Sequence, residues 1–181
     1  MRLIKGITFI HVCIIVLSFL LLLTFNAIGQ DNNLSAIIGL LTEQKTIAEG
    51  CVKEINSKYH EKSINLQQYN NAKHLYLLAS GSFNGLISRL ISDIESSGPI
   101  HRIDYLDEVN RARARGNNFI LFVNDFYRGA LFTGFIKNFG LIAYWLDGIS
   151  KFLPSNRRDK EILINRLNSL KWQTFEELSA I

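Results

Sequence analysis

Prolines are almost absent from this chain, and this constrains its fold more than any other feature of the sequence. Only Pro99 and Pro154 occur in 181 residues. Because proline is the residue that most strongly breaks helices, the long stretches between the two are free to form uninterrupted helices. Hydrophobic residues make up 48% of the chain and charged residues 20%, which is typical of a globular protein rather than a disordered one.

The spacing of apolar residues predicts where these helices lie. From Leu34 to Tyr59, and again from about Leu66 to Ser96, apolar residues recur every three or four positions, as they do on one face of a helix. A third helix is expected to begin near Arg102, and another to follow Pro154. The sequence therefore predicts an all-α fold, a bundle of four to five antiparallel helices.

Three glycines and one apolar run leave local alternatives open. Gly81 and Gly85 should each weaken the second helix by about 1 kcal/mol relative to alanine, unless another backbone packs against them. Gly116 indicates either a break in the third helix or a tight helix contact. The five apolar residues 119–123 fit a buried strand or a buried helix, and the helical neighbours favour the helix.

The N-terminal residues have the charge and hydropathy pattern of a membrane-targeting segment. Arg2 and Lys5 precede an almost purely apolar run over residues 7–25. Ala27 and Gly29 place small residues where a signal peptidase cuts, yet the run is also long enough, at about 19 residues, to remain as an anchor. Residues 1–29 are thus interpreted as a signal peptide or signal anchor, followed by one helical domain over residues 30–181.

Either fate of this leader sends the body to the same compartment. Positive charges before an apolar run hold the N-terminus in the cytoplasm, so the body is expected to be extracytoplasmic: periplasmic, secreted or membrane-anchored. Without Arg2 and Lys5, 18 basic residues face 16 acidic ones, and this near balance argues against nucleic-acid binding. Cys51 has no other body cysteine to pair with and is expected to be buried as a small apolar residue.

No residue pattern specifies a reaction or a cofactor. The sequence has no Glu-x-x-His pair, phosphate-binding glycine loop or Gly-x-Ser-x-Gly elbow. His101, Asp104, Asp107 and Glu108 stack at helical intervals and suit a divalent ion, but carboxylates at the start of a helix are also stabilised by the helix dipole alone. The second explanation is favoured, and we expect neither a metal nor another cofactor.

The most apolar part of the body lies between residues 129 and 153. Its aromatic side chains suit the centre of the bundle, but they also suit a surface that docks onto a partner or a membrane, because basic residues follow them. A second membrane span is disfavoured by Lys137 and Asn138 near the middle. The candidate partner or membrane surface consists of Phe132, Phe135, Phe139, Trp145, Phe152, Lys151, Arg157 and Arg158.

Together these patterns favour a non-enzymatic, extracytoplasmic helical module that binds a protein partner, as a component of a cell-envelope assembly. Membrane contact is expected only through the N-terminal segment in this hypothesis. One alternative is a membrane-acting protein that uses the aromatic segment 129–153. Another is a small exported hydrolase, which would need acidic residues or a metal to converge in a cleft.

Overall fold

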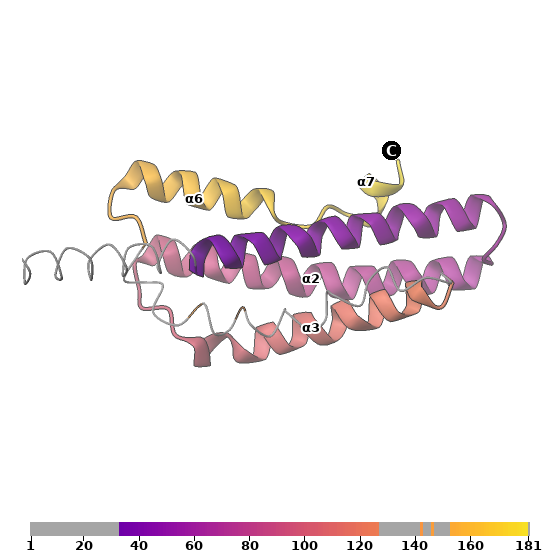
Figure 1. Ribbon diagram of the computed structural model, residues 1–181, viewed down its shortest axis with the longest axis horizontal. Coiled ribbons are helices and arrows are strands. Elements are labelled where there is room, and N and C mark those ends of the chain that lie inside the picture. Colours follow the sequence, from indigo (N-terminus) through magenta and orange to yellow (C-terminus); the bar gives the residue numbers. More distant parts are fainter. Residues whose placement is uncertain (1–32, 127–141, 143–145, 147–152, 181) are drawn as a thin grey trace, which may run out of the picture.

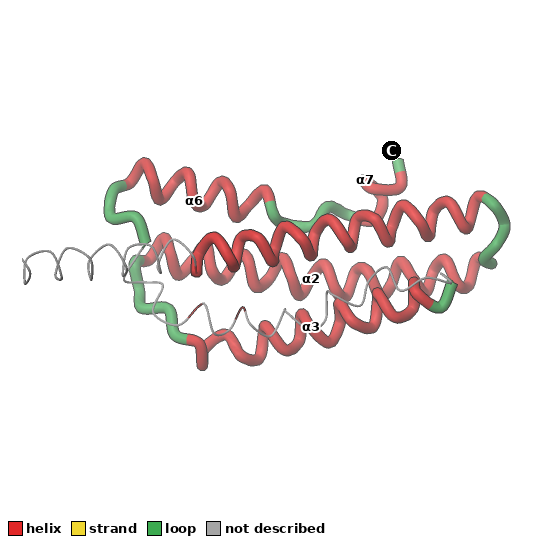
Figure 2. The backbone as a smooth tube through the Cα atoms, in the orientation of Figure 1, coloured by secondary structure: helices red, strands yellow, loops and turns green. Residues whose placement is uncertain are grey.

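All regular structure in the described part of the chain is helical. The computed structural model describes residues 33–126, 142, 146 and 153–180. Within these ranges the first helix covers residues 33–60, and it is followed by α2 (Leu66–Ser96), α3 (Arg102–Asn124), α6 (Arg157–Ser169) and α7 (Phe175–Ser179). Figure 1 shows the first three long helices side by side, with α6 running along one side of them near one end. The predicted all-α class is confirmed for these residues, which contain no strand (Figure 2).

A capping box begins α2, and a left-handed residue ends it. Asn65 caps the start: its side chain accepts from the main-chain N–H of Gln68 (2.9 Å), and the Gln68 side chain accepts from that of Asn65 (2.8 Å). At the other end Ser97 adopts a left-handed conformation (φ 56°) just before Gly98 and Pro99. The short turn at residues 61–65 makes α2 antiparallel to the first helix (Figure 1).

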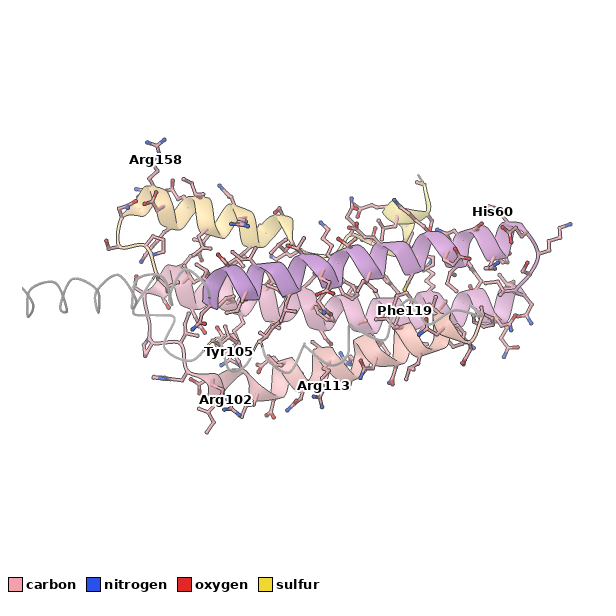
Figure 3. The ribbon with its side chains drawn as sticks, in the orientation of Figure 1. His60, Arg102, Tyr105, Arg113, Phe119 and Arg158 are labelled. Carbon is pink, nitrogen blue, oxygen red and sulfur yellow. The ribbon has the colours of Figure 1, made fainter. Side chains whose placement is uncertain are left out.

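The alternatives at Gly116 and at residues 119–123 are resolved by α3. This helix runs without a break from Arg102 to Asn124, so the apolar run is helical and Gly116 is no break. Gly116 is itself buried, together with Phe119 and Ile120 of the apolar run. Phe119 points from α3 toward the other helices (Figure 3).

The core lies between the first helix, α2 and α3. Phe83 and Phe119 are completely buried, and the ring of Phe119 meets that of Tyr76 edge-on at 5.4 Å. The predicted burial of Cys51 is confirmed, and burial raises the pKa of its thiol to about 12. A neutral, buried thiol behaves here as a small hydrophobic side chain rather than as a nucleophile.

Polar side chains join α2 to α3 at the edge of this core. Arg89 forms an ion pair with Glu108 and lies over the ring of Tyr105, whose hydroxyl donates to Asp93. Glu108 was one of four residues considered above for a divalent ion, and it is engaged by Arg89 instead. Within the described ranges no three metal-ligating side chains come together.

The C-terminal helices begin at the caps that the sequence indicates. Asn156 accepts from the main-chain N–H of Asp159 (2.8 Å), and Thr174 forms a capping box with Glu177. Leu163, Leu167 and Leu170 are buried, whereas the adjacent Ile162 is 57% exposed. Among the helices in these described ranges, none is long and apolar enough to cross a membrane.

Candidate functional site: a groove beside helix α2

The surface predicted from the sequence falls mostly outside the described residues. Two of its members belong to α6, and both are exposed; Arg157 pairs with Glu161 one turn further on (2.8 Å). Arg158 projects from the start of α6, away from the other helices (Figure 3). The members outside the described residues are Phe132, Phe135, Phe139, Trp145, Lys151 and Phe152.

A groove that sequence reasoning missed lies between α2 and the C-terminal segment, which we define as residues 170–180. We call it the α2 groove; its volume is about 490 Å³. Leu77 and Gly81 line it from α2, and Trp172 and Phe175 line it from the C-terminal segment. Leu77 is 66% exposed, so its side chain is available to a molecule that enters the groove.

Hydrogen bonds from α2 hold the C-terminal segment in place. Asn84 contacts the main chain of Trp172 twice, because its Nδ2 donates to the carbonyl (3.1 Å) and its Oδ1 accepts from the N–H (2.8 Å). About two helical turns before Asn84 in α2, the Tyr76 hydroxyl donates to the carbonyl of Gln173 (2.7 Å). Burial raises the pKa of Tyr76, so this hydroxyl keeps its proton and remains a donor.

The ring of Trp172 forms the boundary between the groove and the core. It stacks on Phe83 with centroids 4.3 Å apart and lies 5.7 Å from the ring of Tyr76. Trp172 is only 5% exposed, and its Nε1 has no hydrogen-bond partner among the described residues. A buried indole N–H without an acceptor loses the hydrogen bond that it makes to water in the unfolded chain.

The rim of the α2 groove carries one ion pair. Lys73 of α2 and Glu176 of α7 are joined at 2.6 Å, and both side chains are exposed. The hydrogen bond and the opposite charge raise the pKa of Lys73 and lower that of Glu176, so both remain charged at neutral pH. Because exposed pairs contribute little to stability, this pair shapes the rim more than it holds the fold together.

No hydroxyl of the groove is arranged as a nucleophile in the described structure. Ser80 donates to the main-chain oxygen of Leu77 (3.2 Å), within its own helix. The hydroxyl oxygen of Thr174 accepts the capping bond from Glu177 (3.2 Å). The groove thus combines apolar walls, a C-terminal segment held by main-chain hydrogen bonds and a charged rim, which are features of binding sites.

A second, smaller hollow adjoins the α2 groove on the side of α3. It measures about 140 Å³, and Gly81 lines both hollows. Gly85 continues its floor, while Arg111 and Arg115 of α3 form its wall. Arg115 is fixed there, because its Nη1 donates to Ser82 Oγ (2.8 Å).

The exposed face of α2 between the two hollows carries no charge. It consists of small residues after Leu77, and a Cβ built at Gly81 or Gly85 meets no atom within 4 Å. Within the described ranges, no backbone therefore packs against these two glycines. The residues of this uncharged line are Leu77, Gly81, Gly85, Ser88 and Ser92.

Arginines occupy alternate positions of α3 at residues 111, 113 and 115, so they do not all lie on one face of this helix. Arg111 and Arg115 are one turn apart and line the same hollow, whereas Arg113 lies on the outer side of α3 (Figure 3).

In comparisons with known proteins, no family model, no curated protein and no solved structure matches the chain.

Proposed function

We propose that this chain is a non-enzymatic, extracytoplasmic helical module that binds a protein partner in a cell-envelope assembly, and that the α2 groove is its binding site. The observation that carries this proposal is the exposed, uncharged line of α2, of which Leu77, Gly81 and Gly85 line two adjoining hollows. Water-facing helices ordinarily carry charged residues on such a face. A helix that leaves leucine and glycine there fits a surface that a partner covers.

The size and lining of the α2 groove support binding. A volume of about 490 Å³ lies within the range usual for ligand sites, and apolar walls with a few fixed polar groups are what such sites share. Leu77 and the aromatic side chains supply apolar contact area, while the clamp at Asn84 keeps the wall rigid. Rigid sites lose little conformational entropy on binding.

The proposed compartment rests on the charged and then apolar order of the leader, and a fusion tests it. Alkaline phosphatase, which becomes active only where disulfides form, is fused after Ile181. The full chain should give an active enzyme, and deletion of residues 2–29 should abolish the activity. Activity of a cytosolic reporter such as β-galactosidase at the same position would contradict export.

Site-specific crosslinking in cells tests the binding site. A photoreactive amino acid in place of Leu77 should give a discrete adduct with another protein, because this side chain is exposed within the groove. The same amino acid in place of Glu43, exposed on the first helix, is the control and should give no such adduct. Placed at Arg158, it tests the surface expected from the sequence.

Filling the groove should remove the Leu77 adduct. Gly81→Leu places a side chain in the open space of both hollows, whereas Gly50→Leu places one on an equally open, exposed position of the first helix. We expect the adduct to persist in the Gly50 variant only. An adduct that survives Gly81→Leu, or one that forms only from Arg158, would refute the α2 groove as the binding site.

A further inference from the structure

The floor and wall of the two hollows also indicate the chemistry of the partner, an inference that rests on the proposed function. We infer that the α2 line from Leu77 to Ser92 receives an amphipathic helix of another protein that carries acidic residues along one edge. The α2 line would contact small residues of the partner helix, and the acidic edge of the partner helix would face Arg111 and Arg115. An apolar side chain at one end of the partner helix would enter the α2 groove.

The glycines of the floor favour a helix as the occupant. Two glycines within a helix destabilise it, and neither Gly81 nor Gly85 has a neighbour that would require the absence of a Cβ. Neither has a left-handed backbone, since both lie inside the continuous helix α2. Small residues one turn apart allow a second helix to approach closely, which bulkier side chains would prevent.

The wall supplies the charge. Arg111 and Arg115 line the smaller hollow, and neither forms an ion pair with any residue that the structure describes. Glu108, the carboxylate that lines this hollow with them, is already paired with Arg89. Arginine binds carboxylates through parallel hydrogen bonds, so two arginines one turn apart suit two carboxylates one turn apart on a facing helix.

The opposite end of the line supplies an apolar contact and an unused donor. Trp172 is more than nine-tenths buried and lines the α2 groove, and its Nε1 lacks an acceptor within the described ranges. Leu77 lies on the other wall and is largely exposed. A large apolar side chain of the partner would cover Leu77 and contact the aromatic side chains on the opposite wall.

A second copy of the same helix fits less well. If two α2 helices met along this line, each would present leucine, glycine and serine to the other and no carboxylate to Arg111 or Arg115. The arginines of both copies would then face one another near a largely apolar contact. Like charges in such a position oppose association.

Synthetic helices provide the test, with the full chain held in lipid nanodiscs. The probe is a labelled peptide of about 20 residues with alanine on its contact line, leucine at one end and glutamates along one edge. A matched peptide carries lysines in place of the glutamates. Binding is followed by fluorescence anisotropy at low and high salt, and circular dichroism checks that each protein variant is folded.

The acidic peptide should bind at least about tenfold more tightly than the basic one, and salt should reduce the difference. The double variant Arg111→Glu/Arg115→Glu should reverse this preference. Gly85→Leu should weaken binding of the acidic peptide at least about tenfold by blocking the floor, and Gly50→Leu should leave it unchanged.

Failure of this inference is distinguishable from failure of the proposed function. Equal binding of the two peptides, or no binding of the acidic one, overturns the acidic helix, even if the Leu77 adduct still depends on Gly81. A dimer in sedimentation that Gly85→Leu dissociates also overturns it, because the occupant would then be a second copy. Loss of the Leu77 adduct as well would remove the binding site itself.

Discussion

Phe83→Ala is expected to lower the free energy of unfolding by about 3–5 kcal/mol, because the substitution leaves a cavity at the centre of the core. The Phe83 side chain is fully buried, and its ring stacks on that of Trp172 with centroids 4.3 Å apart. Its loss therefore removes contacts between α2 and the C-terminal segment. For a chain of this size the midpoint of thermal unfolding should fall by about 10 °C. Urea and thermal unfolding of the full chain measure the change.

Leu77→Ala is the matched control. It removes an apolar side chain from the same helix, but one that is 66% exposed, so we expect a change within about 0.5 kcal/mol. The pair of variants separates the two roles of α2: Phe83 serves the fold, and Leu77 serves the groove. A loss below about 1 kcal/mol for Phe83→Ala would show that its stack with Trp172 is not part of the stable core.

The helices were predictable because they depend on local patterns. The apolar spacing of α2 and the caps at Asn156 and Thr174 depend on neighbouring residues, and the structure contains them where the sequence indicates. The run at residues 119–123 was ambiguous because five apolar residues have no periodicity of their own. Only its position within the continuous helix α3 decides its structure.

The α2 groove was not predictable in the same way. Its wall depends on Asn84 holding Trp172, a contact between residues 88 positions apart that no local pattern encodes. One signal was present in the sequence: Gly81 and Gly85 lie one turn apart in an otherwise regular helix. They were recognised as costly, but their exposure depends on where α3 and the C-terminal segment pack.

The interpretation of basic residues also changed once the helices were placed. Sequence reasoning assigned Arg157 and Arg158 to a partner or membrane surface and assigned no role to the arginines of α3. In the structure Arg111 and Arg115 line a hollow, whereas Arg157 pairs with a residue of its own helix. Charge counts along the sequence do not distinguish these environments, because the distinction arises from the neighbouring helix.

Asn84→Ala should release the C-terminal segment while most of the bundle stays folded. The substitution removes both side-chain hydrogen bonds to the main chain of Trp172, which is buried. Each unsatisfied group costs about 1–3 kcal/mol, so a local opening of residues 172–178 should become easier by at least about 2 kcal/mol. Amide hydrogen exchange in this segment should then accelerate at least about 30-fold.

The control and the unaffected regions make this result specific. Asn71→Ala replaces an exposed asparagine of the same helix and should leave exchange in the C-terminal segment unchanged. Amides at the centre of α3 should keep their protection in both variants, because α3 packs against α2 through Arg89 and Glu108 and does not depend on Asn84. If the Asn84 variant instead lost protection throughout α2 and α3, the segment would be part of the global folding unit, and Asn84 would not hold this wall of the groove alone.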